Sequence, residues 1–446
     1  MKRSKIALAL AFSATTLFLS ACNDSNDDYI GVNPEQTYIS ETTYNKDQVT
    51  GAASVKVMTY NMVNVLGKTA KATAMVMFPK ITQPADGYRV VVWEHGTVGV
   101  GDSCAPSNTT INPRFKILAD TLLAAGYVVI APDYEGLGTP GIHPYLNLGS
   151  EAKSAIAAVK AAKDHYGSQL NGTWMSVGQS QGGQASLGTA EYANNDATYL
   201  GAVAGAPASS LGKIILEVAP AALADIEKKE ITANVPLANR VSVDSYATLL
   251  AYAALTGVGI KAYDTQFNYR DIFQERAKPL AEFAEGTTGE NGLCLDNDDA
   301  SLSLIEKFKT DIIKFMTDNP DKKVMDYPGL DTNNFKTNQT VQTFLTANQP
   351  GTKRIDKPVY IVQGTADTNV PYPVTQALVS NLKDTLGSPD VVLDPVLNAT
   401  HTQAIVCRNL QVYNFIQAKM PAKTGITLDT AAIDASTSPH CTGVGL

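Results

Sequence analysis

The sequence predicts an α/β fold: a mostly parallel, doubly wound sheet with a large, mainly helical insertion. Short apolar runs alternate with helical patterns over residues 51–208 and again over 351–446, as expected for parallel strands covered on both faces. The alternation stops at residues 209–350, where the pattern is largely helical. A glycine-rich junction between a strand and a helix, WMSVGQSQGG, occupies residues 174–183.

These patterns divide the chain into four parts. We expect a signal peptide at 1–21, a tether at 22–50, a core at 51–208 and 351–446, and a cap at 209–350. The cap begins directly after a strand, where the active-site loops of doubly wound sheets emerge. A length of 446 residues accommodates one large α/β domain with such an insertion, or two domains.

The individual elements follow from apolar runs and from helix signals. A turn at Gly67-Lys68 joins the first two strands, and Gly126 closes the first helix. We expect strands at 55–63, 70–78, 88–94, 127–131, 174–177, 200–206, 358–363 and 391–393. We expect helices at 114–125, 150–166, 184–193, 374–386 and 403–418, and in the cap at 243–255 and 302–316.

The N-terminal sequence is typical of a targeting segment. A basic start precedes the apolar residues 6–19, and Leu19-Ser20-Ala21-Cys22 resembles a bacterial lipobox in which Cys22 is lipidated. An ordinary secretory signal with a chance cysteine is the alternative. Asn23 favours the outer membrane by analogy, so we expect an exported, lipid-anchored protein of the bacterial cell envelope. We expect no later stretch long and apolar enough to span a membrane.

Charge and cysteine content narrow the function classes. The net charge of −8, without a strongly basic patch, argues against nucleic-acid binding. Outside Cys22 the cysteines are Cys104, Cys294, Cys407 and Cys441, and export makes two disulfides plausible. Three pairings are possible. Cys407–Cys441 would staple the tail to the last helix, and Cys104–Cys294 would then tie an early loop to the middle of the chain; free thiols are the alternative.

Ser180 is the candidate nucleophile. It is central to the G-x-S-x-G pattern at 178–182, which places a serine on a tight strand-to-helix turn with its hydroxyl exposed. The flanking glycines fit because a Cβ there would collide with the neighbouring strand and helix. A glycine-rich turn without chemistry is the alternative.

A serine needs a base and an acid as partners. Of the five histidines, His401 lies in a loop directly before the last helix, and we expect it to be the base. Asp367 ends the loop after the strand at 358–363 and is the expected acid, with Asp390 and Asp394 as weaker rivals. Surface-loop roles are the alternatives for both.

The oxyanion of acyl transfer needs two backbone N–H donors. We expect one from Gln181, which follows the nucleophile, and the other from Thr97 or Gly96 in the loop after the strand at 88–94. His95 would then position that loop. Neither H-E-x-x-H nor a Cys/His cluster predicts zinc, and the glycine pattern at 136–141 opens no helix, so no metal or nucleotide cofactor is expected.

Several of these segments resemble the secretory lipase family of α/β-hydrolases, which includes yeast lipase A-type enzymes. The resemblance covers about residues 55–418 and rests on HGT at 95–97, APDYEGLG at 131–138, GQSQGG at 178–183, GTAD at 364–367 and the His401 loop. It implies an α/β-hydrolase fold, a serine esterase or lipase with a helical cap, and a disulfide from the early loop to the cap, which Cys104 and Cys294 would supply. The lipobox and the cap sequence depart from the fungal relatives.

Together these observations predict a serine carboxylic-ester hydrolase that acts through an acyl-enzyme on a small-molecule or lipid ester. Many aliphatic residues in the cap favour an apolar substrate. A peptidase or amidase of the same fold is the nearest alternative. A catalytically silent lipoprotein that binds a ligand under the cap is the alternative from another class.

Overall fold

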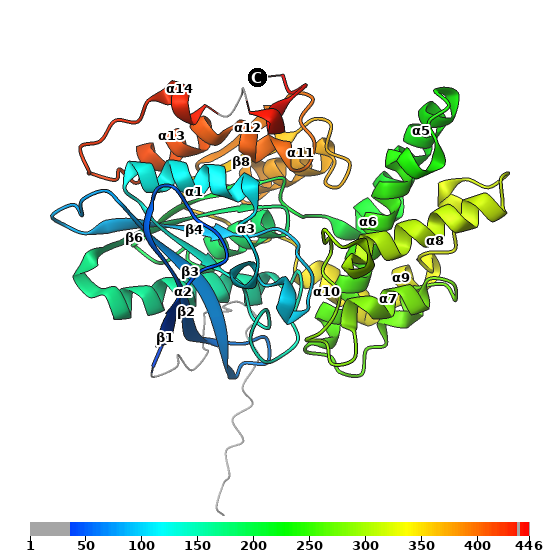
Figure 1. Cartoon of the computed structure of the whole chain (residues 1–446), viewed down its shortest axis with the longest axis horizontal. Helices are drawn as coiled ribbons and strands as arrows, with labels where there is room; N and C mark the ends of the chain where they lie inside the picture. Colours follow the sequence, from blue (N-terminus) through cyan, green and yellow to red (C-terminus); the bar gives the residue numbers. More distant parts are fainter. Residues whose placement is uncertain (1–35, 435–437, 446) are drawn as a thin grey trace, which may run out of the picture. The chain divides into compact units, whose positions relative to one another are not determined.

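The computed structural model describes residues 36–434 and 438–445, so the predicted signal peptide and Cys22 lie outside the described residues. The core of the molecule is a nine-stranded sheet in the order β1-β2-β3-β5-β4-β6-β7-β8-β9 (Figure 1). Its strands are β1 (Tyr38–Thr43), β2 (Ala52–Val63), β3 (Thr69–Pro79), β4 (Tyr88–Glu94), β5 (Val128–Pro132), β6 (Leu170–Gln179), β7 (Tyr199–Gly205), β8 (Val359–Gly364) and β9 (Val391–Val396).

The sheet changes direction between its two ends. β1, β2, β3 and β5 pair antiparallel, whereas β5, β4, β6, β7, β8 and β9 pair parallel. The parallel part aligns the carboxyl ends of its strands at one edge, and the loops that leave this edge carry the candidate site. β1 lies within residues 22–50, so the sheet begins inside the segment expected to be a tether. Its polar sequence, YISETT, fits a partly exposed edge strand and gives little apolar signal.

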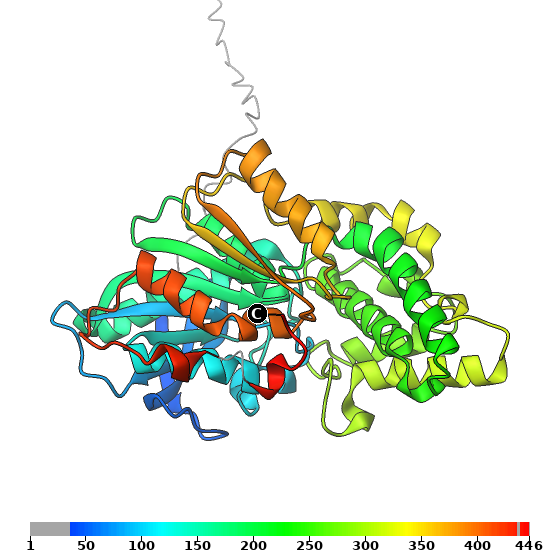
Figure 2. The same ribbon diagram turned by 90° about the horizontal axis from the view of Figure 1, so that it is seen from above.

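Helices cover both faces of the sheet (Figures 1 and 2). Alternate strand residues point to opposite faces: Val91 and Val129 join one core cluster with α1, α12 and α13, and Val90 and Val128 join another with α2, α3 and α11. These helices are α1 (Pro113–Ala125), α2 (Leu148–Tyr166), α3 (Gln181–Tyr192), α11 (Tyr372–Ser380), α12 (Gln403–Cys407) and α13 (Asn409–Lys419), and the short α14 (Thr430–Ile433) packs on α13.

The last predicted helix, 403–418, is interrupted. α12 and α13 are separated at Arg408, whose guanidinium forms an ion pair with Asp394 of β9, Nε to Oδ2 3.0 Å. The predicted single helix is therefore wrong at this one residue, where the backbone of Arg408 leaves the helical conformation with φ −105° and ψ 21°.

Helices between β7 and β8 form the cap, which is drawn in green and yellow in Figure 1. They enclose an apolar cluster of their own, with α6 contributing the largest set of buried residues. The cap helices are α4 (Leu211–Lys213), α5 (Ala219–Thr232), α6 (Val241–Lys261), α7 (Lys278–Glu285), α8 (Leu304–Asp318), α9 (Thr332–Thr337) and α10 (Gln339–Ala347).

Helix α6 corrects one expectation. By length and composition alone it is long and apolar enough to cross a membrane. The prediction from the sequence was that no stretch after the N-terminus would be. In the structure, 67% of its most apolar window is buried. The central helix of a protein core meets the same composition test, because it is apolar on every side.

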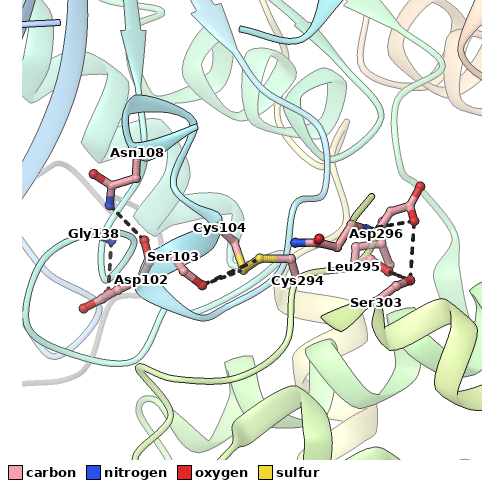
Figure 3. Close-up of a disulfide and its surroundings, with 10 residues drawn as sticks. Asp102, Ser103, Cys104, Asn108, Gly138, Cys294, Leu295, Asp296 and Ser303 are labelled. Carbon is pink, nitrogen blue, oxygen red and sulfur yellow. Dashed lines mark hydrogen bonds between the residues drawn. A yellow bond between two sulfur atoms is a disulfide. The ribbon is translucent and has the colours of Figure 1, made fainter. Parts of the chain in front are cut away.

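Two disulfides tie distant parts of the chain. Cys104 pairs with Cys294, joining the loop after β4 to the cap loop that precedes α8 (Figure 3). Cys407 pairs with Cys441, joining α12 to the C-terminal tail. Of the three pairings open to the sequence, the structure holds this one.

Buried polar contacts fix the segment by which the chain returns from cap to core. Gln184 of α3 donates through Nε2 to the carbonyl oxygen of Asn348 at 2.8 Å, and Asn348 Oδ1 accepts from the backbone N–H of Leu148 at 3.0 Å. Glu191 accepts from the backbone N–H of Gly351 at 2.7 Å. The returning segment at 348–351 is therefore held by α2 and α3 of the core.

Candidate active site

Ser180 stands on the turn between β6 and α3. Its backbone has φ 62° and ψ −118°, a strained conformation for a residue with a side chain. A Cβ on Gly178 would lie 2.0 Å from Gly182 O, and a Cβ on Gly182 would lie 1.8 Å from Glu94 O. Both positions therefore exclude any side chain, and the tight turn needs the glycines on either side of Ser180.

The turn is also fastened to the neighbouring strand. The backbone N–H of Ser180 donates to Gly205 O of β7 at 2.8 Å, and the N–H of Ala208 donates to Ser180 O at 3.1 Å. These bonds hold the strained residue in place, so the hydroxyl projects at a defined point above the carboxyl edge of the sheet.

Three side chains form one hydrogen-bonded series at this edge. Ser180 Oγ lies 2.7 Å from His401 Nε2, and His401 Nδ1 lies 2.8 Å from Asp367 Oδ2. With the Nδ1 proton donated to the carboxylate, Nε2 is free to accept the serine proton. The structure thus brings together residues that are 221 and 34 positions apart in the sequence.

The carboxylate of Asp367 is buried and fully occupied. Oδ1 accepts from the backbone N–H groups of Asn369 at 2.8 Å and Val370 at 2.9 Å. Oδ2 accepts from Gln363 Nε2 at 2.8 Å in addition to His401. Its orientation is therefore set by four donors, so it holds the imidazole in one position.

The rival acids lie in other contacts. Asp394 pairs with Arg408 and accepts from the hydroxyl of Tyr360, and Asp390 pairs with Lys419. Among the described residues, neither hydrogen-bonds to the ring of His401, which contacts Asp367 and Ser180.

The expected oxyanion donors flank Ser180. Gln181 is the first residue of α3, so its backbone N–H has no partner within the helix. Thr97 lies on the loop after β4 and lines the same cavities as Ser180. A Cβ on Gly96 would lie 3.0 Å from Gln179 O, so this loop packs tightly against the turn.

His95 lies behind that loop. Its ring nitrogens lie 2.7 Å from Gly96 O and 3.2 Å from Asp133 O, and burial lowers its pKa. The side chain of Asp133 in turn accepts from the backbone N–H of Ser107 at 2.9 Å. These contacts fit the expected role of His95 in holding the loop.

The sequence reading missed a buried polar group behind Gln181. Gln181 Nε2 donates to Glu151 Oε1 at 2.7 Å and lies 3.2 Å from His143 Nε2. His143 Nδ1 lies 2.8 Å from Glu135 O and donates to it, so Nε2 is the acceptor. Burial lowers the pKa of His143 to about 3 and raises that of Glu151 to about 8. No local pattern signals this group, because its members meet only in the fold.

Two cavities open at Ser180. A narrow one of about 60 Å³ runs into the cap and is lined mostly by apolar side chains of α6, α9 and α10, among them Leu249, Phe335 and Val341. A wide one of about 840 Å³ lies between α1 and α12 on the core side and residues 291–298 on the cap side. An ester carbonyl at Ser180 would have room for one substituent in each.

Comparisons with known proteins bear on the family and the fold. A family model described as Secretory lipase matches residues 106–234. The rice cell wall degrading esterase LipA from Xanthomonas oryzae superposes with a TM-score of 0.60 at 18% identity, over 87% of this chain and 99% of that chain. The resemblance to the secretory lipase family is confirmed. The fold is that of the α/β-hydrolases.

Two further structures share the fold. Candida antarctica lipase A in its closed state has a TM-score of 0.61 at 15% identity, over 89% of this chain and 84% of that chain. A putative hydrolase from Legionella pneumophila has a TM-score of 0.60 at 14% identity, over 88% of this chain and 100% of that chain. No curated protein sequence matches the chain. The resemblance to secretory lipases supports an ester hydrolase.

Proposed function

We propose that the protein is a serine carboxylic-ester hydrolase that acts through an acyl-enzyme. The observation that carries the proposal is the continuous series Ser180 Oγ–His401 Nε2–Asp367 Oδ2, with separations of 2.7 Å and 2.8 Å. A hydroxyl on a strained turn, next to a neutral imidazole acceptor and a buried carboxylate, is the arrangement that activates serine.

In the proposed reaction, Ser180 Oγ attacks the ester carbonyl carbon while His401 Nε2 takes the hydroxyl proton. The carbonyl oxygen becomes an oxyanion, which the backbone N–H of Gln181 and that of Thr97 or Gly96 stabilise. When the C–O bond to the alcohol breaks, His401 returns its proton to the leaving oxygen. Water then attacks the acyl-enzyme, again with His401 as base, and releases the acid.

The narrow cavity supports an apolar acyl group. Its wall consists mainly of aliphatic and aromatic side chains from the cap, and it begins at Ser180. Burying each methylene of an acyl chain there contributes about 0.8 kcal/mol of binding free energy. We therefore propose lipid or other apolar esters as substrates.

Replacement of the nucleophile tests the proposal. Ser180→Ala should abolish hydrolysis of para-nitrophenyl esters and labelling by a fluorophosphonate, and it should leave the unfolding midpoint nearly unchanged. Asp394→Asn, at the rival acid, is the matched control and should keep activity. Equal ester hydrolysis by Ser180→Ala and the parent would exclude the assignment.

Parallel assays separate the alternative functions. Faster turnover of aminoacyl anilides than of esters would indicate a peptidase or amidase of the same fold. A folded parent protein that neither hydrolyses esters nor reacts with the fluorophosphonate would indicate a silent binding protein.

We also propose that the protein is anchored to the cell envelope through a lipid on Cys22. The basis is the lipobox-like segment at 19–22 in the sequence. Cells fed a radioactive fatty acid should label the parent protein and not Cys22→Ala. Equal labelling of the parent and Cys22→Ala would contradict lipidation at Cys22.

A further inference from the structure

The two cavities at Ser180 share four lining residues: Thr97, Ser180, Tyr252 and His401. Three of them belong to the proposed reaction, as nucleophile, base and oxyanion loop. The fourth, Tyr252, comes from the cap helix α6 and has no role in that chemistry. Tyr252 therefore stands where the narrow and the wide cavity meet, directly beside the point at which an ester carbonyl would be attacked.

Tyr252 is held firmly in this place. Its side chain lies beside Asn369, which lines the narrow cavity with it and whose backbone N–H donates to Asp367 Oδ1 at 2.8 Å. Burial, and then the charge of Asp367, raise the pKa of Tyr252, so the hydroxyl stays neutral. Its neighbours on the helix, Ala251 and Ala253, are buried in the cap core. Fixed by its helix at one end and by Asn369 at the other, the ring forms a rigid wall.

The cavities on either side of this wall differ in size and chemistry. The narrow one, about 60 Å³, is lined mainly by apolar side chains such as Ile260 and Phe335. The wide one, about 840 Å³, presents polar groups such as Asn112 and Asn297 as well as apolar ones. A bulky substituent fits only the wide side, and a branch next to the carbonyl on the narrow side would meet the Tyr252 ring.

We propose that Tyr252 is a specificity-determining residue that sorts the two halves of an ester between these cavities. It directs a straight acyl chain into the narrow cavity and rejects acyl groups branched beside the carbonyl, while the wide cavity receives a bulky alcohol. This inference rests on the proposed ester hydrolysis and names its substrate class: esters of unbranched fatty acids with large alcohols.

Two isomeric acyl groups test the wall. Para-nitrophenyl octanoate and para-nitrophenyl valproate carry the same atoms, with valproate branched beside the carbonyl. The parent should prefer octanoate, and Tyr252→Ala should lower the octanoate-to-valproate ratio of kcat/KM by about ten-fold or more, the size expected when a pocket contact is removed. Tyr252→Phe keeps the ring and should keep the ratio within about two-fold of the parent.

Tyr263→Ala is the matched control, because it removes a tyrosine from the same cap that lines neither cavity. It should leave the ratio unchanged. If Tyr252→Ala does not fold, Tyr252→Leu removes the ring while keeping an apolar side chain, and it should lower the ratio in the same direction. An unchanged ratio in a folded, active variant without the ring would overturn the inference.

A second pair of substrates tests the wide side. The parent should hydrolyse the octanoate ester of cyclohexylmethanol at least as efficiently, in kcat/KM, as that of methanol. A ten-fold or larger preference for the methyl ester would overturn the assignment of the alcohol to the wide cavity. Titration of active sites with a fluorophosphonate separates the two hypotheses. A parent protein that does not react would contradict the proposed ester hydrolase itself. A parent protein that reacts but does not show the expected acyl or alcohol preference would contradict only the role of Tyr252.

Discussion

The core and the cap supply different things to the same site. In the core, each reacting group follows a strand of the parallel sheet, and backbone hydrogen bonds hold the loops that carry them. The cap supplies no group to the Ser180–His401–Asp367 series; it contributes Tyr252 and most of the narrow cavity through side-chain packing. Backbone geometry therefore positions the reacting groups, whereas side-chain packing in the cap shapes the narrow cavity beside them.

The two regions are nevertheless built to act together. The disulfide Cys104–Cys294 joins them beside the wide cavity, and buried amides hold the segment that returns from the cap. Tyr252 reaches from the cap to Asn369, next to the carboxylate that orients His401. Substitutions in the core should therefore change the rate of hydrolysis, whereas substitutions in the cap should change the preference among substrates.

The largest effect is expected in the core, from Asp367→Asn. Two backbone N–H groups and Gln363 donate to this carboxylate, and the amide would favour the wrong imidazole tautomer. We expect kcat for a good ester to fall about ten-thousand-fold with little change in fold. Steady-state kinetics with circular dichroism as a folding check measures this, and Asp394→Asn is the control. A loss below ten-fold would mean that another group orients His401.

The next effect concerns the covalent link between the regions. Cys104→Ser/Cys294→Ser opens a loop with a sequence separation of 190, and the chain-entropy model then predicts a loss of about 5 kcal/mol of unfolding free energy. Urea unfolding measures it. Cys407→Ser/Cys441→Ser, which opens a separation of 34 within the core, should lose about 4 kcal/mol and keep the acyl selectivity. Identical urea midpoints for parent and the first double variant would contradict the expectation.

The same contrast explains what the sequence could predict. The turn around Ser180 can be predicted from the sequence because the contacts that require Gly178 and Gly182 are local. A Cβ at either position would collide with the turn itself or with the adjacent strand β4. Asp367 and His401 can be predicted because they follow strands in the chain order Ser…Asp…His that α/β-hydrolases use. Strands β4 and β5 can be predicted because they are buried on both faces and so have apolar runs, VVVW at 90–93 and VVIA at 128–131.

What the sequence could not predict depends on distant partners. β1 is polar and half exposed, so it becomes a strand only by pairing with β2. His143 lies in a loop rich in proline and glycine, and only the fold brings its ring to Gln181. Tyr252 is one aromatic residue in an apolar helix, a pattern that is typical of any core helix.

A smaller effect should show whether cap and core unfold together. Leu250 of α6 and Leu187 of α3 are both fully buried, one in each region, and neither lines a cavity. Each change to alanine should cost about 2–5 kcal/mol. Because the described residues, 36–434 and 438–445, belong to one compact unit, we expect a single urea transition that shifts similarly for both variants. A separate early transition for Leu250→Ala, seen by limited proteolysis of the cap, would show that the cap unfolds alone.

A pH-dependent effect probes the buried group behind Gln181. Burial raises the pKa of Glu151 from 4.5 to about 8, so between these values the native protein holds a proton that the unfolded chain has lost. The native state then binds more protons, and this group's contribution to stability falls as pH rises through that window, by up to about 1.4 kcal/mol per pH unit. Below pH 4.5 the contribution is complete, and above pH 8 it is lost.

Glu151→Gln removes this titration while keeping an oxygen for Gln181 Nε2 and the N–H of Leu146. Relative to the parent, the variant should therefore gain stability on going from pH 5 to pH 8 in urea unfolding. Other buried carboxyls with raised pKa, such as Glu191 at about 7, are present in both proteins and cancel in the difference. A difference that stays constant across this range would show that Glu151 ionises in the fold as it does in water, and that Gln181 is held by a carboxylate.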